Sequence, residues 1–346
     1  MQGSQPELSE RQREILRVVV EEYVTTGQPV GSKNVVARGG MGVSPSTVRN
    51  ELASLETLGL LMHPHTSAGR VPTERGYRLF AGGVLERLDA RPRAFPLDLT
   101  FVRSEVDGAL QATTEMLSQV TRLLALVSAP PLETTTVRHV EVLTLQPDVV
   151  MVVVITSSGG VTKRVFAFDR AVDTGLAQWA GEYLNERVAG LTLGSGALRK
   201  RLDDEELAPQ EREFLRALRT AFTDAADDER RLYVGGAAGL LDDVRGEELG
   251  AYRRLLEVLE KRAAMLELLR GSLDARRPFV RVGDELDHPA LTNVALVGAA
   301  YGLAHRTLGT VSLLGPVRMD YEKAIQSVHS AAAALSRFVE QVYEEN

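Results

Sequence analysis

The sequence predicts an α+β protein of several domains that begins with a winged helix-turn-helix. Two observations in the N-terminal part predict this unit: three helical patterns fall within the first 60 residues, and a strand–turn–strand pattern over 60–73 follows them. Later, three β-rich runs precede a group of helical stretches, and the last third mixes strands with long helices. With 346 residues, the chain is long enough for about two or three domains.

Composition narrows the functional classes. The chain has no cysteine, which excludes disulfides, thiol nucleophiles and thiolate zinc sites. No apolar run is long enough to cross a bilayer, and the first residues lack a cationic stretch followed by an apolar one. We therefore expect a cytoplasmic protein that has no membrane partner and no secretory signal.

The net charge of −7 is unevenly distributed. Residues 203–229 contain ten acidic residues and three arginines, a local charge of −7. Residues 28–80 contain three acidic residues and six basic ones, namely Lys33, Arg38, Arg49, Arg70, Arg75 and Arg78. The N-terminal part is thus locally basic and can bind phosphates although the whole chain is acidic.

The first helix is predicted from Ser9, which forms a capping-box pair with Gln12. Apolar residues then recur at helical spacing as far as Tyr23, and Gly27 and Pro29 end the pattern. A short second helix is predicted over 32–38, and the glycine-rich GGMGV that follows it turns the chain.

The third helix is predicted to begin at Ser44 as N-cap with Pro45 in the first turn, and to stop near Gly59. At about 100° per residue, one face is apolar and is predicted to be buried. The opposite face has small or hydrogen-bonding side chains, as a helix that enters the major groove requires, because Arg can bind guanine and Asn can bind adenine. The apolar face consists of Val48, Leu52 and Leu55, and the opposite face of Ser46, Arg49, Asn50 and Ala53.

Residues 60–73 predict a β-hairpin whose tip is 66–69, with His65 and Arg70 on its flanks. A hairpin directly after three helices is typical of the wing of a winged helix, and its polar groups suit phosphate or minor-groove contacts. A solvated helix face remains an alternative interpretation of the third helix. A metal site at His63 and His65 is disfavoured because no carboxylate or thiol lies near them in sequence.

The segment 90–98 is predicted to be a linker, since two prolines lie among charged residues. A long helix is expected over 99–126. Three strands are then expected over 139–146, 149–157 and 161–169, joined as an antiparallel meander. The middle run is apolar on both faces, so it should be a central strand or lie against a partner.

Helices are expected over 174–187 and 209–226, with a shorter piece near 198–207. The composition changes at 227–241, where one unit is expected to end and another to resume. The last third predicts a helix over 247–270, strands near 279–283, 293–301 and 306–316, and a terminal helix over 321–343.

Several long strings resemble one family. SPSTVRNELASLETLGLL at 44–61 and PHTSAGRVPTERGYR at 64–78 resemble the N-terminal domain of HrcA, the heat-inducible transcription repressor of bacteria, as does the opening segment 8–32. The resemblance continues in GLTLG at 190–194, in VRVGDE at 280–285 and in RTLGTVSLLGPVRMDY at 306–321. It therefore covers nearly the whole chain.

The resemblance implies which residues contact DNA. Ser46, Thr47, Arg49 and Asn50 would face operator bases, the wing would add contacts, and Arg75 is a weaker phosphate candidate. The full set of candidate DNA-binding residues is Ser44, Ser46, Thr47, Arg49, Asn50, His65, Thr66, Ser67, Arg70 and Arg75.

It also implies the organisation of the chain. Residues 1–89 would be the DNA-binding domain, 98–136 and 229–346 would together form a GAF-like α+β domain, and 137–228 would be an inserted α+β dimerisation domain with a three-stranded antiparallel sheet. The implied partners are double-stranded operator DNA with an inverted repeat, a second copy of the chain, and the GroE chaperonin, which would keep the repressor of chaperone operons active.

Other motifs carry weaker alternatives. GPVRMDY at 315–321 would suit an anion site, but a helix start with Arg318 and Asp320 as a structural pair fits better. LYVGGAAGLL lacks the glycine order of a nucleotide-binding loop and suits close packing, the acidic run 203–206 suits a solvated face, and 158–160 suits a turn. We expect no catalytic residues, no cofactor and no metal. The alternative function is a winged-helix regulator whose GAF-like domain senses a small ligand.

Overall fold

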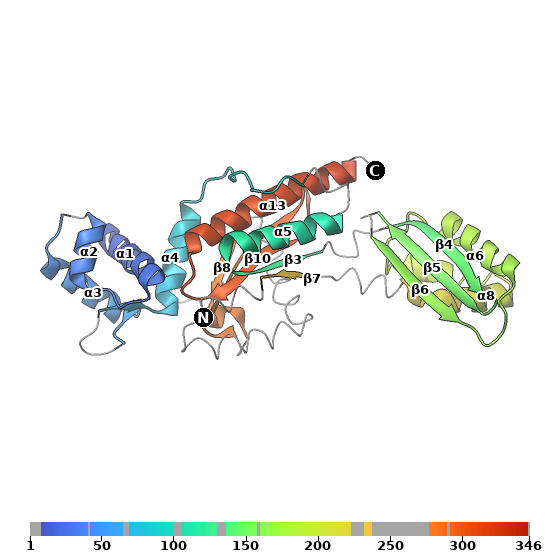
Figure 1. Ribbon diagram of the computed structural model, residues 1–346, viewed down its shortest axis with the longest axis horizontal. Coiled ribbons are helices and arrows are strands. Elements are labelled where there is room, and N and C mark those ends of the chain that lie inside the picture. The colour runs from blue at the N-terminus through green and yellow to red at the C-terminus, as the bar shows by residue number, and fades with distance from the viewer. Residues whose placement is uncertain are drawn as a thin grey trace.

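The computed structural model shows three units in a row, with helices α1, α2 and α3 at one end and a three-stranded sheet at the other (Figure 1). A five-stranded sheet lies in the unit between them. The residues that the structure describes are 8–40, 42–64, 69–99, 106–129, 136–157, 160–222, 232–236, 277–288 and 291–344.

The N-terminal unit begins with the predicted capping box. The Ser9 hydroxyl accepts from the Gln12 amide at 3.2 Å, and the Gln12 side chain accepts from the Ser9 amide at 3.0 Å. Gly27, with φ of 64°, ends the first helix. The three helices are α1 (Glu10–Thr26), α2 (Ser32–Gly39) and α3 (Pro45–Thr57). The local cap and turn residues therefore set the boundaries that the sequence predicted.

The wing follows α3 as predicted. Strands β1 (Leu61–Met62) and β2 (Val71–Pro72) pair antiparallel, and Val30, from the turn between α1 and α2, forms a β-bridge with Arg70. The chain then enters α4 (Glu74–Glu86), whose N-cap Thr73 accepts from the Gly76 amide. Wing and helices thus form one connected unit.

The central unit is an antiparallel sheet with strand order β7-β3-β10-β9-β8. Helices α5 and α13 lie together against the sheet (Figure 1). Strand β3 pairs with β10, which is 182 residues away in sequence at the Ser128–Thr310 contact, so the sheet closes across the chain. The elements are α5 (Val106–Thr121), β3 (Leu124–Ser128), β7 (Leu232–Gly235), β8 (Phe279–Val282), β9 (Val294–Leu303), β10 (Arg306–Pro316) and α13 (Tyr321–Glu344).

The third unit lies between β3 and β7 in sequence, although those two strands are hydrogen-bonded neighbours. Its sheet is the predicted antiparallel meander in the order β4-β5-β6, and it has a hydrophobic core of its own. The central position predicted for the apolar run at 149–157 is confirmed. The elements are β4 (Val137–Gln146), β5 (Val149–Thr156), β6 (Val161–Ala167), α6 (Thr174–Arg187), α7 (Gly196–Leu202) and α8 (Pro209–Leu218).

The helix predicted over 99–126 is wrong at its C-terminal end. Helix α5 ends at Thr121, Arg122 adopts a positive φ of 58°, and β3 begins at Leu124. Residues 124–128 are all buried, so both faces of the strand are apolar, and such a short run has no periodicity that separates strand from helix. The part of this prediction over 100–105 lies outside the described residues.

Other boundaries differ less. The piece expected near 198–207 is a helix over Gly196–Leu202 followed by turns. The predicted strands of the last third and its terminal helix are confirmed within a few residues. The helix predicted over 247–270 and the end of the one over 209–226 lie outside the described residues.

Helix α4 joins the N-terminal and central units. Tyr77 and Phe80 approach Tyr321 at the start of α13, with ring centroids 6.0 Å and 6.3 Å from it. Arg78 donates from its Nε to both carboxylate oxygens of Glu285, which lies in a short 3-10 turn after β8, at 2.9 Å. One hydrophobic core runs through both units, so α4 fixes the N-terminal unit to the sheet.

We predict opposite effects for two glycine substitutions in α4. A Cβ at Gly76 would lie 2.2 Å from the carbonyl oxygen of Leu60, whereas one at Gly83 meets nothing within 4 Å. Gly76→Ala should lower stability by about 1–3 kcal/mol through overpacking. Gly83→Ala, the matched control, should raise it by about 0.5–1 kcal/mol through reduced unfolded-state entropy. Calorimetric scans of the full chain test this, and equal unfolding temperatures for the two variants would contradict it.

Candidate nucleic-acid interface

The exposed face of α3 has the side chains that the sequence predicted. Val48, Leu52 and Leu55 are buried, at 0%, 4% and 0% exposure, which turns Ser46, Arg49 and Asn50 to the surface. The Gln12 side chain donates to the Ser54 hydroxyl at 3.2 Å and holds α3 against α1. The face with Ser46, Arg49 and Asn50 is exposed because the opposite face of α3 is packed in the core.

Hydroxyl groups gather at the N-terminus of α3. Ser44 lies 2.7 Å from the Ser46 hydroxyl and 3.0 Å from that of Thr47, and its oxygen also accepts from the Thr47 amide. Ser44 thus caps the helix, while Thr47 is half-buried and Ser46 is exposed. This end of α3 offers a hydroxyl cluster at the positive end of a helix dipole, which favours a phosphate.

Arg49 and Asn50 are both exposed on α3. Neither makes a hydrogen bond or ion pair with another described residue. The adjacent Glu51 faces Arg11 of α1 at 3.7 Å, which places a cation beside this carboxylate. The guanidinium and the carboxamide are therefore available to a ligand, and both can bind a base edge in bidentate fashion.

Half of the basic residues counted in 28–80 are engaged in ion pairs. Arg38 pairs with Glu22 at 2.6 Å, and Arg78 pairs with Glu285 across the unit boundary. Of those six, the ones that are exposed and have no such partner among the described residues are Lys33, Arg49 and Arg75. Lys33 was not among our candidates. Lys33 is exposed in the first turn of α2. The sequence shows it only as one of six basic residues and does not show which of them remain unpaired after folding.

The structure places Arg70 differently from our expectation of a wing contact. Its side chain is 15% exposed, its Nη2 lies 2.8 Å from Glu56 of α3, and its Nη1 contacts His63 Nδ1 at 2.9 Å. Arg70 therefore ties the base of the wing to the C-terminal end of α3. The sequence could not show this pairing because Arg70 and Glu56 meet only after the wing folds back. His65, Thr66 and Ser67 lie outside the described residues.

No group of three metal-ligating side chains occurs among the described residues. The His63 ring contacts Arg70, and its Nε2 lies 3.8 Å from Glu56. This is a structural position beside an ion pair.

The sequence motifs that also suggested other kinds of site have structural roles in the fold. In GPVRMDY, the Asp320 side chain accepts from the Lys323 amide at the start of α13, as a helix start requires. A Cβ at Gly236 would lie 2.0 Å from the Ser118 hydroxyl, so the LYVGG glycines allow close packing. In the run 203–206, Asp203 pairs with Arg216, and Asp204 accepts from Tyr183.

Comparison with known proteins gives a consistent result. The family model "Winged helix-turn-helix transcription repressor, HrcA DNA-binding" matches residues 7–83, and "HrcA protein C terminal domain" matches 107–325. The heat-inducible transcription repressor HrcA of Parafrankia sp. is 36% identical over 340 residues, which cover 94% of this chain and 97% of the relative. That of Streptomyces avermitilis is 36% identical over 348 residues, covering 98% and 100%.

One solved structure supports the fold over the same length. A crystal structure described as that of a hypothetical protein aligns with a TM-score of 0.65 at 23% identity, covering 97% of this chain and 98% of that one. No helix in the described part of the chain has the length and apolarity to span a membrane.

We predict that Arg70→Ala loosens the wing. Loss of a largely buried, charged hydrogen-bonding group should lower the local free energy of opening by about 1–3 kcal/mol. Amide hydrogen exchange at Leu61, Met62 and Val71 in the full chain measures this energy. Arg75→Ala is the matched control, because Arg75 is exposed and has no partner among the described residues. If both variants exchange like the parent chain, Arg70 does not anchor the wing.

Proposed function

The chain belongs to the HrcA family of heat-inducible transcription repressors, and we propose that it represses chaperone operons by binding an inverted-repeat operator as a homodimer. Its relatives are transcription repressors, a non-enzymatic family. The winged-helix unit is the DNA-binding part of the family.

The exposed face of α3 is the observation that supports this proposal most strongly. We infer that Arg49 and Asn50 read bases in the major groove, because both are exposed and neither has a partner among the described residues. Ser46 is small enough to let the helix approach the groove closely. Ser44 and Thr47 lie at the N-terminal end of α3, where a phosphate would be favoured.

Phosphate contacts complete the proposed interface. Arg75 and Lys33 are exposed cations in the first turns of α4 and α2, and the first helix of a helix-turn-helix pair crosses the DNA backbone. The wing residues His65, Thr66 and Ser67 stay in the proposal through the family resemblance. Arg70 is assigned a positioning role, since its guanidinium is engaged with Glu56.

We propose the same division of the chain as the resemblance implies. The central unit would be the GAF-like domain, built from 98–136 and 229–346, and the unit inserted between β3 and β7 would be the dimerisation domain over 137–228. The antiparallel pairing of β3 with β7 supports this division, because it brings the two ends of the insertion together.

The outer face of the inserted sheet supports the homodimer. Helix α6 packs against one face, where Leu184 shares a hydrophobic core with Val140 and Val152, and the other face is exposed and largely apolar. Across that face Leu143, Met151 and Val165 stand opposite one another in register, and Leu143 and Val165 are 42% and 56% exposed. Such a patch is expected at a protein interface.

The same face has a charge pattern that suits a two-fold axis. Val153 of the central strand stands opposite Glu141 on one edge strand and Lys163 on the other. A two-fold dimer places the same patch against itself, so an acid on one side and a base on the other can be complementary. We therefore infer that a second copy of the chain covers this face.

We also propose that the GroE chaperonin modulates the repressor, and the support for this partner is the family alone. The physical basis would be mass action: a chaperone that favours the folded repressor raises its active concentration, and heat that diverts the chaperone lowers it. The operator would then be released under stress.

Replacing Arg49 or Asn50 by Ala should weaken binding to an inverted-repeat operator by about 1–3 kcal/mol and leave binding to scrambled DNA nearly unchanged. Fluorescence anisotropy with the two DNA sequences at one salt concentration measures the difference. Lys200→Ala removes an exposed cation from the inserted unit and serves as the control. Equal losses on both sequences would assign these residues to phosphate contact and refute base reading.

Placing charges on the outer sheet face should break the dimer. Val161 and Val165 are 64% and 56% exposed, so Val161→Asp with Val165→Asp should not disturb the core. Light scattering is expected to give twice the 37.7 kDa chain mass for the parent and the single-chain mass for the variant. Lys200→Asp is the control. A monomeric parent at concentrations that bind DNA, or a dimeric variant, would contradict the proposal.

A further inference from the structure

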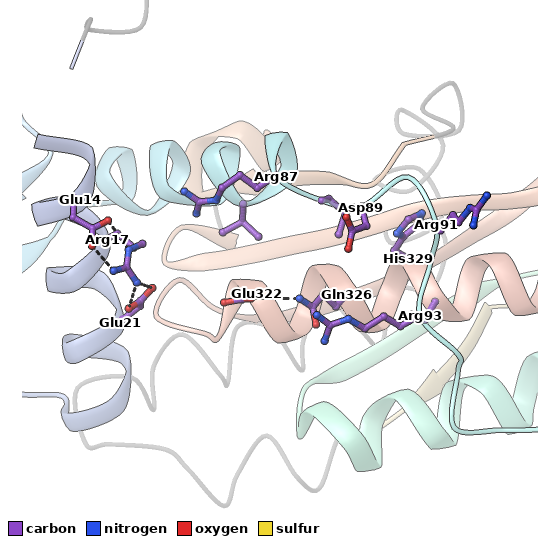
Figure 2. Close-up of a pocket in the computed structure, with 13 residues that line it drawn as sticks. Glu14, Arg17, Glu21, Arg87, Asp89, Arg91, Arg93, Glu322, Gln326 and His329 are labelled. Carbon is purple, nitrogen blue, oxygen red and sulfur yellow. Dashed lines mark hydrogen bonds and ion pairs between the residues drawn. The ribbon is translucent and has the colours of Figure 1, made fainter. Parts of the chain in front are cut away.

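A cavity of about 540 Å³ lies between the N-terminal and central units, and Figure 2 shows its lining. Helix α1 forms one wall, the C-terminal end of α4 and the segment 87–93 form another, and α13 contributes the third. We call it the arginine pocket, after Arg87, Arg91 and Arg93. Its volume is within the range of pockets that hold small molecules. A molecule bound there would touch both units.

The charged side chains that α1 contributes to the pocket are paired with one another. Arg17 donates to Glu21 at 2.8 Å and to Glu14 from both its Nε and Nη2 (Figure 2). The hydrogen bond from Arg17 holds the pKa of Glu14 below its usual value, and the positive charge of Arg87 adds to this effect. These three side chains satisfy one another and form a fixed polar wall.

The arginines of the segment 87–93 have no such carboxylate partners among the described residues. Arg87, Arg91 and Arg93 are exposed, and none makes a hydrogen bond or ion pair with another described residue. Three like charges within seven residues repel one another, and guanidinium groups bind phosphate through paired N–H donors. An anion in the cavity would relieve that repulsion.

The opposite side of the pocket offers acceptors and neutral groups. Asp89 lines it, as does Glu322, which accepts a hydrogen bond from Gln326 at 3.4 Å. Burial lowers the pKa of His329, so its ring is neutral at pH 7 and can both donate and accept. A bare anion would face the carboxylates of Asp89 and Glu322 unfavourably. A ligand with hydroxyl groups would instead donate to them.

The lining also discriminates between phosphorylated ligands. It contains no Phe, Tyr or Trp among the described residues, and its apolar members are Val84 and Leu88. A nucleobase would have no aromatic ring to stack on. The hydroxyl groups of a sugar can be bound by carboxylates and guanidinium groups alone, so the pocket suits a sugar better than a nucleotide.

We propose that the arginine pocket binds a small phosphorylated sugar. The arginines of the segment 87–93 bind the phosphate, and sugar hydroxyls donate to Asp89 and Glu322. Because its walls come from α1, α4 and α13, the bound sugar phosphate adds a second contact between the N-terminal and central units to the one that α4 makes. On the proposed repressor function, which this consequence requires, it fixes the two reading helices and raises operator affinity.

Calorimetric titration of the full chain with glucose 6-phosphate tests binding. We expect saturable binding of one molecule per chain, weaker binding of inorganic phosphate and none of glucose. Arg91→Gln with Arg93→Gln should weaken glucose 6-phosphate binding roughly tenfold or more, as loss of charged hydrogen bonds does. Lys200→Gln with Arg219→Gln, which removes two exposed cations of the inserted unit, should leave it unchanged.

A second variant separates sugar recognition from anion binding. Asp89→Asn with Glu322→Gln should weaken glucose 6-phosphate binding but not phosphate binding, since it removes hydroxyl acceptors and two negative charges. No saturable binding of glucose 6-phosphate, or binding that the Arg91/Arg93 variant leaves intact, overturns the proposal. Tighter binding of adenosine monophosphate than of glucose 6-phosphate overturns the choice of a sugar.

Operator binding with and without glucose 6-phosphate tests the consequence separately. We expect tighter operator binding in its presence for the parent chain and no change for the Arg91/Arg93 variant. Sugar phosphate binding without any effect on DNA would refute the coupling and leave the site standing. A chain that binds the sugar phosphate but no operator would instead refute the repressor function.

Discussion

Helix α4 packs against the wing on one side and against the central sheet and α13 on the other, and the geometry of the whole N-terminal half depends on this double contact. At its start, Gly76 lets the helix approach the Leu60 carbonyl, and at the same turn Glu74 accepts from the Asn293 amide at 3.2 Å. One turn on, Arg78 pairs with Glu285 while Tyr77 faces Tyr321. Because the wing and α1 pack on α4, and α3 packs on α1, their position relative to the central unit is set by these contacts.

The contacts of α4 explain how the chain can hold α3 and the wing in a defined position relative to the central unit. A two-fold repressor must hold its two recognition helices about one helical turn of DNA apart, or a multiple of it. This spacing requires three features, and separate parts of the chain supply them. In our proposal, the exposed face of α3 reads bases, α4 fixes the N-terminal unit to the central sheet, and the inserted sheet offers a largely apolar face to a second chain. The net charge of −7 is compatible with DNA binding by the locally basic residues 28–80, because much of the acidity lies on the inserted unit.

The sequence predicted the features that are local and missed those that need distant partners. Ser9 and Ser44 cap their helices as short-range rules require, and the meander of the inserted sheet follows from its turns. Strand β3 was taken for helix because its partners are β10 and β7, far along the chain. The ion pair of Arg70 was missed for a similar reason, since its partner Glu56 belongs to another element. The arginine pocket could not be predicted, because its walls come from three separated helices and the segment 87–93.

The most direct test is hydroxyl-radical footprinting of the full chain on DNA that carries the inverted repeat upstream of a chaperone operon. The proposed function predicts two protected half-sites related by the two-fold axis of the repeat, with centres about 10–10.5 base pairs apart or a multiple of that spacing. A further strip of protection beside each half-site should mark the wing. Protection of a single half-site, or uniform protection without symmetry, would contradict a homodimer that reads DNA through α3.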